Sequence, residues 1–178
     1  MRHFSPQPRR LICTNLVPLI LTSLACLCLP ALADVYDEVE HMIRNGQLER
    51  AAQLSSRHLD KSPQDPQMRL LRSRILDTQG QTDEALALLQ SLTLDYPELP
   101  EPHNNLAELY ARQGRTQEAI DSLHKALLAR PDYTTALENL GDLHLGLALQ
   151  AYQRASQAPA PAASVKRKSE TIAPLLQR

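Results

Sequence analysis

Apolar residues recur with a helical period over most of this chain, most clearly in the stretch 100–133. The apolar residues of its first half share one face of a helix with 3.6 residues per turn: Leu106, Ala107 and Tyr110. Those of its second half share another face: Ala119, Leu123 and Ala126. Gly114 separates the two halves, and Pro131 follows the second. The pattern predicts two helices packed as a hairpin, with small residues where they cross.

The hairpin pattern recurs every 34 residues, in three columns that mark helix ends or helix contacts. The columns are Gly46, Gly80 and Gly114; Ala51, Ala85 and Ala119; and Pro63, Pro97 and Pro131. Glycine ends a helix readily because it adopts positive φ, alanine permits close helix approach, and proline cannot continue a helix. Because one hairpin buries little apolar surface, we expect the copies to stack.

The repeat resembles the tetratricopeptide repeat (TPR) family, whose unit has this length and these marks. The resemblance is carried by Leu106, Ala107, Tyr110, Ala119, Leu123, Ala126 and Pro131. His103 stands where the family usually has tryptophan. The resemblance implies an all-α fold, in which helical hairpins stack into an α-α superhelix, or TPR solenoid.

Four units follow one another along the chain, at about 32–65, 66–99, 100–133 and 134–157. The last is degenerate. Its Leu140 and Gly141 match the first helix of the other units, but Ala148 stands where the turn glycine belongs. Apolar residues keep helical phase past this point. We therefore predict three helical hairpins and one long C-terminal capping helix over about 134–157, which together form a TPR domain at 34–157.

The segment 1–33 has the pattern of a secretory signal peptide. Three arginines precede an apolar run from Leu11 to Leu29, and the segment ends in Ala31-Leu32-Ala33. We expect cleavage after Ala33, and the short basic leader is typical of bacterial export to the periplasm. The whole chain has a net charge of −1; without the leader, 16 basic residues face 20 acidic ones, which gives −4.

Two alternatives to a cleaved leader stay open. Ser23-Leu24-Ala25-Cys26 loosely resembles a lipoprotein processing site, and the apolar run is nearly long enough to anchor the chain uncleaved. A membrane is a partner only in these two cases. All three cysteines lie in the leader, so we expect no disulfide in the exported chain.

The composition changes at Ala158. The stretch from there to Ser164 is rich in proline and alanine, and a short basic cluster, 166–168, follows. Such composition without regularly spaced large apolar residues predicts a disordered tail over 158–178. Ile172, Leu175 and Leu176 form a candidate docking motif within that tail.

No arrangement of residues in the sequence predicts catalysis. The five histidines after the leader have no metal-ligand spacing, and neither a glycine-rich phosphate loop nor a nucleophile elbow occurs. We therefore expect no metal, no cofactor and no enzyme activity. Nucleic acid binding is disfavoured by the negative charge and by export.

The family resemblance implies a binding groove lined by the first helix of each unit. The candidate partner-binding residues are Arg74, Asn104, Asn105, Glu108, Arg112, Glu138, Asn139 and Asp142. Asn105 and Asn139 match a frequent family asparagine whose amide can hold the backbone of an extended peptide. The lysines of the family's carboxylate clamp are missing, and the acidic residues at this end favour a polar or basic partner segment.

The sequence thus predicts a non-catalytic periplasmic scaffold or adaptor, which binds another protein or an extended peptide segment in cell-envelope assembly or maintenance. Two alternatives remain. One is a structural protein that associates with a second copy of itself through the last helix, using Leu147, Leu149 and Tyr152. The other is an accessory subunit of a cell-wall or polysaccharide-processing enzyme.

Overall fold

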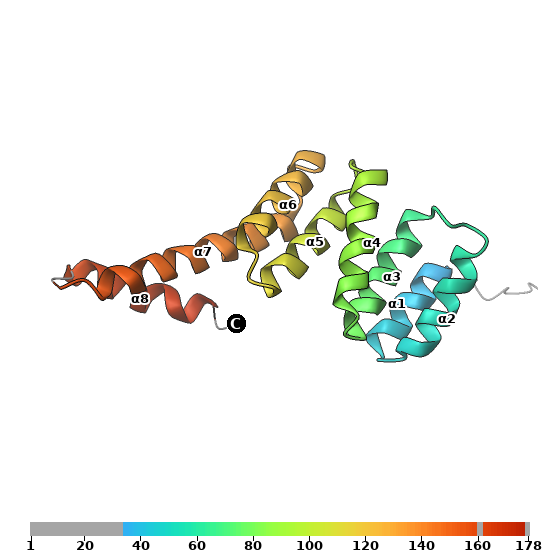
Figure 1. The fold of residues 1–178 in the computed structure, drawn as a ribbon, viewed down its shortest axis with the longest axis horizontal. Helices are drawn as coiled ribbons and strands as arrows, with labels where there is room; N and C mark the ends of the chain where they lie inside the picture. The colour runs from blue at the N-terminus through green and yellow to red at the C-terminus, as the bar shows by residue number, and fades with distance from the viewer. Residues whose placement is uncertain (1–33, 160–161, 177–178) are drawn as a thin grey trace, which may run out of the picture. The chain divides into compact units, whose positions relative to one another are not determined.

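The protein is seen here in a computed structural model, which describes residues 34–159 and 162–176. These residues form helices and no strand (Figure 1). The elements are α1 (Val35–Arg44), α2 (Leu48–Leu59), α3 (Pro66–Thr78), α4 (Thr82–Asp95), α5 (Pro100–Arg112), α6 (Thr116–Ala129), α7 (Thr134–Ser156), α8 (Ala163–Ile172) and the 3-10 helix η1 (Ala173–Leu176). The predicted signal peptide, 1–33, lies outside the described residues and stays a prediction.

The three hairpins turn at the three evenly spaced glycines of the sequence. Gly46, Gly80 and Gly114 have φ of +69°, +80° and +72°, which residues with a Cβ adopt only at a cost. After α5, the Gly114 amide donates to the Ala111 carbonyl and the Arg115 amide to the Tyr110 carbonyl, at 3.0 and 2.9 Å. These bonds satisfy carbonyls that the end of a helix leaves without a partner. The predicted role of the glycine column is confirmed.

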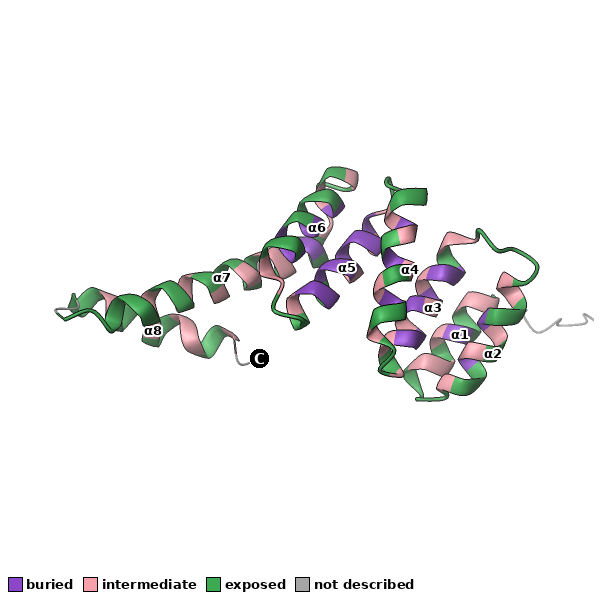
Figure 2. Cartoon of the chain, viewed as in Figure 1, coloured by how far each residue is buried: buried purple, intermediate pink, exposed green. Residues whose placement is uncertain are grey.

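Each helix from α1 to α7 packs on the next one along the chain, and α1 also contacts α3 as α5 contacts α7. The buried residues follow these contacts, as the purple segments of α3, α5 and α6 show (Figure 2). Ala51, Ala85 and Ala119, the alanine column, are each 0% exposed. Small side chains therefore do lie at the close helix contacts. The α-α solenoid of three hairpins is the fold that the sequence predicts.

The core divides into two clusters of buried residues. The N-terminal cluster comprises Val39, Ala51, Met68, Leu71 and Ile75. The C-terminal cluster comprises Leu76, Ala85, Leu89, Leu92, Leu106, Ala107, Leu109, Tyr110, Ala119, Leu123, Ala126 and Ala136. Helix α3 contributes to both, because Ile75 and Leu76 point to different sides of it. The first helices of the hairpins pack on these two clusters with their buried faces.

The last unit is one helix, as predicted. Helix α7 has 23 residues, which corresponds to a length of about 35 Å. Its only fully buried residue is Ala136, near its beginning. The positions of Leu137, Gly141 and His144 in α7 correspond to those of His103, Ala107 and Tyr110 in α5. These three α5 residues are buried, and α6 folds back on that helix. In α7 no second helix of its own unit folds back, and its Leu137 is 49% exposed.

The tail differs from the sequence prediction. We expect disorder over 158–178, but the structure has α8 and η1 there, packed along α7. Four half-buried residues of this segment recur with helical spacing: Val165, Ser169, Ile172 and Leu176. Lys166, Arg167, Lys168 and Glu170, which lie between them, are good helix formers. Prediction from composition missed this stripe because its apolar residues are few and widely spaced among charged ones.

Along the helices that the structure describes, none combines the length and apolar content needed to cross a bilayer.

Candidate interaction groove

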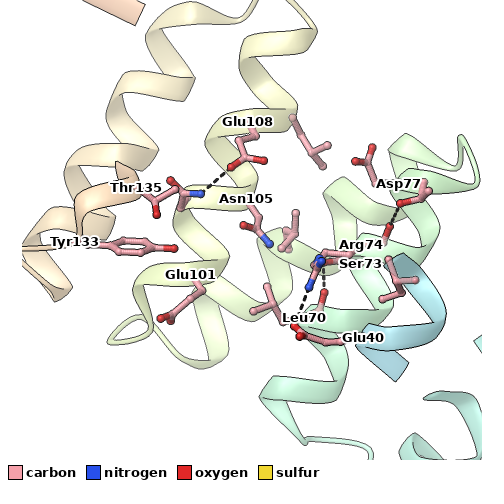
Figure 3. A pocket seen from close by; sticks show the side chains of 15 residues that line it. Glu40, Leu70, Ser73, Arg74, Asp77, Glu101, Asn105, Glu108, Tyr133 and Thr135 are labelled. Carbon is pink, nitrogen blue, oxygen red and sulfur yellow. Dashed lines mark hydrogen bonds and ion pairs between the residues drawn. The ribbon is translucent and has the colours of Figure 1, made fainter. Parts of the chain in front are cut away.

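A groove runs along the first helices of the hairpins. Its main cavity has a volume of about 490 Å³ and is walled by α1, α3 and α5, with the beginning of α7 at one end (Figure 3). The lining residues are Glu40, Ile43, Leu70, Ser73, Arg74, Asp77, Thr78, Leu89, Glu101, Asn104, Asn105, Glu108, Leu109, Tyr133 and Thr135. Four predicted partner-binding residues therefore line one cavity: Arg74, Asn104, Asn105 and Glu108.

Ion pairs join consecutive units along this wall. Arg74 lies 3.0 Å from Glu40 of the preceding unit, and Arg112 lies 2.5 Å from Asp77 of the preceding unit. The paired residues are 34 and 35 positions apart, so the repeat itself brings them together. Arg74 and Arg112 thus have structural partners in addition to the binding role that the sequence predicts for them.

A hydrogen-bonded chain of amides crosses from α5 to α7. The buried Asn104, 2% exposed, donates to Glu108 at 2.9 Å and accepts from Asn139 at 2.9 Å. The Asn139 amide also lies 3.5 Å from the same Glu108 oxygen. The two amides hold Glu108 in one position at the centre of the groove.

Asn105 is placed differently from its repeat equivalent, Asn139. The residue that accepts from Asn139 is Asn104, and the residue one unit before Asn104 is Leu70, which has no acceptor in its side chain. No hydrogen bond joins the Asn105 side chain to any residue within 34–159 or 162–176. Asn105 is half-buried and points into the main cavity (Figure 3). It therefore presents both a donor and an acceptor to the groove.

A second, smaller cavity lies beside the first, between α5, α6 and α7. We call it the α5–α7 pocket. It has a volume of about 300 Å³, and its lining residues are Ala107, Glu108, Ala111, Arg112, Leu123, Asn139, Asp142 and Leu143. Glu108 belongs to both cavities, so they form one continuous surface. Seven of the eight predicted partner-binding residues line one or both cavities, whereas Glu138 is exposed on α7 and lines neither.

Sequence reasoning missed several groove residues. Glu40 lies 34 positions before Arg74, and that spacing was the signal that could have found it. Tyr133 and Thr135 enter the main cavity from the turn before α7 and its first turn (Figure 3). Burial raises the pKa of Tyr133, and the negative charge of Glu101 raises it further. Tyr133 therefore stays neutral and contributes a hydroxyl and an aromatic ring.

The residues predicted for self-association lie on the distal half of α7. Leu147 is 40% exposed, whereas Leu149 and Tyr152 are half-buried. The ammonium group of Lys168, on α8, lies 5.2 Å from the centre of the Tyr152 ring. One side of this segment is thus already occupied by the chain's own tail, and self-association stays a prediction.

The chemistry of the groove is that of recognition. Its polar groups are carboxylates, amides, hydroxyls and guanidinium groups, most of them bonded to one another. Within the described ranges, no three His, Cys, Asp or Glu side chains are grouped as a metal site would require. The arrangement suits hydrogen bonding and charge pairing with an extended ligand.

Fold and groove together define an α-helical repeat protein of the solenoid class. The family model of the tetratricopeptide repeat matches residues 42–112 and 78–140, which together make up more than half of the chain. The chain therefore belongs to the tetratricopeptide repeat family. Its fold is one that generally serves as a protein-interaction scaffold rather than as a catalyst. No curated protein matches the sequence.

Several solved structures are similar to this one. YrrB, a TPR protein with an unusual peptide-binding site, has a TM-score of 0.53 and 24% identity over 58% of this chain and 54% of its own. The first TPR of Spaghetti (RPAP3), bound to an HSP90 peptide, has a TM-score of 0.57 and 13% identity over 64% of this chain and 90% of its own. The Sgt2 TPR domain from Aspergillus fumigatus has a TM-score of 0.61 and 15% identity over 72% of this chain and 85% of its own. At such identities the likeness is one of fold, and this chain spans about half of YrrB.

Proposed function

We propose that the protein is an exported, non-catalytic scaffold of the bacterial cell envelope, which holds an extended segment of another protein in its groove. The observation that carries the proposal is the position of Asn105. Its amide lies in the main cavity and has no acceptor in the preceding unit, unlike the amide of Asn139. A side-chain amide so placed can pair with the N–H and C=O of an extended backbone.

The form of the groove supports an extended partner. The two cavities adjoin at Glu108 and follow the first helices of successive hairpins, as an elongated ligand requires. Among the similar structures, YrrB has a peptide-binding site and the first TPR of Spaghetti (RPAP3) is bound to a peptide, which agrees with this use of the fold. Their identities are too low to transfer a partner, so the partner is inferred from this groove alone.

Export rests on the sequence. The basic start, the apolar run and Ala31-Leu32-Ala33 favour cleavage before Asp34 and a periplasmic location. The absence of cysteine from residues 34–178 suits an oxidising compartment, since no thiol is present to mispair.

Site-specific crosslinking in intact cells tests the proposal. A photoreactive amino acid replaces Asn105 in one strain and His124, which is exposed on α6 and lines neither cavity, in a matched control. We expect a discrete adduct with one or a few envelope proteins from position 105 alone. We also expect the chain in the periplasmic fraction to begin at Asp34.

Two results would contradict the proposal. Identical adducts from positions 105 and 124 would show that the groove is not the binding surface. A chain that keeps segment 1–33 and stays in the cytoplasm, with no adduct at 105, would exclude the envelope role.

A further inference from the structure

The α5–α7 pocket combines an apolar floor with carboxylates at its edge. The half-buried Ala111 and Leu143 supply the apolar surface, and the buried Ala107 and Leu123 lie beneath it. Glu108 and Asp142 supply two negative charges from the facing helices α5 and α7. A pocket of about 300 Å³ with this lining can hold the stem of a long side chain and, at its edge, the charged end of that side chain.

Among the described residues, the one cation that lines the pocket is already paired. Arg112 lies 2.5 Å from Asp77 of the preceding unit, so its charge is compensated outside the pocket. Glu108 is held by amides, which are neutral, and none of the described residues forms an ion pair with Glu108 or Asp142. Glu138, one turn before Asp142 on α7, adds a third exposed carboxylate nearby. The edge of the pocket therefore has an excess of negative charge.

The position of Glu108 is fixed before any ligand arrives. Its Oε1 accepts from Asn104 at 2.9 Å and lies 3.5 Å from the Asn139 amide nitrogen. Oε2 has no hydrogen-bond partner among residues 34–159 and 162–176, so its acceptor sites are open. Because the carboxylate is already ordered, pairing with a cation costs little side-chain entropy on this side.

We infer that the α5–α7 pocket selects a lysine or arginine side chain of the bound segment. The aliphatic stem lies on Ala111 and Leu143, and the charged end lies between Glu108 and Asp142. An acidic side chain is repelled here, and a purely apolar one covers the carboxylates without pairing them. The inference rests on the proposed function, since it assigns the chemistry of the partner that the groove binds.

A random peptide library displayed on phage tests this specificity even while the partner is unidentified. The purified chain from residue 34 to residue 178 is the bait, next to a Glu108→Gln/Asp142→Asn double variant. The control variant, Asp83→Asn/Glu84→Gln, removes the same two charges from exposed residues at the start of α4, outside both cavities. Both pairs of substitutions are nearly isosteric, and circular dichroism checks that all three baits keep their helices.

We expect wild type and control to enrich peptides with lysine or arginine at one fixed position, and the double variant to lose that preference. In a synthetic selected peptide, replacing this residue by norleucine should weaken binding to wild type by about two- to five-fold for each ion pair lost, the range of exposed ion pairs. The same replacement should leave binding to the double variant unchanged, and the wild-type difference should shrink at high salt.

The outcomes separate this inference from the proposed function. Selected peptides that prefer an apolar or acidic residue at the pocket, or that bind both variants alike, overturn the inference and leave peptide binding intact. A library that gives no peptide bound in the groove overturns both.

Discussion

At the scale of single residues, Asp65 connects three helices through one carboxylate. Its Oδ1 accepts from the Met68 amide at 3.0 Å and so caps α3. Its Oδ2 accepts from the Tyr36 hydroxyl of α1 at 2.5 Å and lies 2.8 Å from Nε2 of His58, on α2. Tyr36 and His58 also meet edge to face, with ring centres 5.4 Å apart. This cluster explains a histidine in α2 where the later units have Leu92 and Ala126 at the equivalent position.

The Asp65 cluster predicts a dependence of stability on pH. Burial alone would raise the pKa of Asp65, but hydrogen bonds from Tyr36, the Met68 amide and His58 together lower it below the ordinary 3.8. The folded state therefore binds fewer protons than the unfolded one. The stabilisation is complete above about pH 4 and is lost as the pH falls through the folded-state pKa.

Replacing Asp65 by Ala should lower the free energy of unfolding at neutral pH by about 1–3 kcal/mol, because a helix cap and two tertiary hydrogen bonds are lost. Asp65→Asn keeps a good capping residue but cannot ionise. Urea unfolding from pH 7 to 3 should show the wild type losing stability more steeply than the Asn variant. Parallel curves for the two proteins would mean that Asp65 is not coupled to its neighbours as described.

His103, which stands at the family's tryptophan position, has a contact that the sequence does not predict. The sequence marks it as a departure from the family pattern but gives it no contact. In the structure it is 5% exposed, and its Nε2 lies 3.2 Å from the Pro97 carbonyl oxygen. Burial lowers the pKa of this imidazole, so it is neutral at pH 7. The Nε2 of this buried ring has a loop carbonyl within reach, a contact that no pattern in the sequence shows.

At the scale of helices, glycine has opposite effects at a turn and within a helix. Gly114 ends α5 with φ of +72°, whereas Gly141 lies inside α7, where its φ is not positive. An added Cβ would meet nothing within 4 Å at either position. The two sites therefore differ in backbone conformation alone.

This pair gives a matched prediction. Gly114→Ala should destabilise the protein by about 1–2 kcal/mol, the cost of a left-handed conformation with a Cβ. Gly141→Ala should stabilise it by about 0.5–1 kcal/mol, because alanine loses less freedom in a helix. Thermal unfolding of both variants measures the two changes. A shift in the same direction for both would show that packing, not backbone conformation, controls one of the sites.

The turns between helices are predicted by the sequence where residues that end or turn a helix recur. Glycines and prolines at fixed spacing predict α1 to α6, and unbroken apolar phase predicts α7 as a single helix. Helix α8 was missed for the opposite reason. Its contact with α7 depends on a few half-buried residues such as Val165 and Ile172 within a proline- and lysine-rich segment. That contact becomes visible only when both helices are placed together.

At the scale of the whole molecule, stability is expected to be local, because the described core is divided into two clusters that share α3. In a solenoid each unit contacts only its neighbours, so damage in one cluster need not spread to the other. Met68 of the N-terminal cluster and Leu123 of the C-terminal cluster are both 0% exposed and are suitable probes.

Met68→Ala and Leu123→Ala should each cost about 2–5 kcal/mol locally. Hydrogen exchange followed by mass spectrometry should show faster exchange in α1–α3 for the first variant and in α5–α6 for the second. Equal acceleration across all helices in both variants would indicate a single cooperative unit instead.

The groove was predicted less completely than the fold. Family positions on the first helices identify its wall, and seven of the eight named residues do line the two cavities. What the sequence could not predict is which of these side chains are already bonded. Arg74, Arg112 and Asn139 have partners in a neighbouring unit, whereas Asn105 has Leu70 at the corresponding place. Whether a side chain is already bonded depends on its distance from side chains of the neighbouring unit, which the sequence does not show.

The ion pairs between units have a further effect on anything that binds there. Glu40 with Arg74, and Asp77 with Arg112, connect neighbouring hairpins across the wall of the groove at 3.0 and 2.5 Å. These ion pairs reduce the rotational freedom of the four side chains in the unbound state. The entropic cost of association therefore falls mainly on the incoming segment, and a rigid or proline-restricted segment would be held more tightly than a flexible one of equal chemistry.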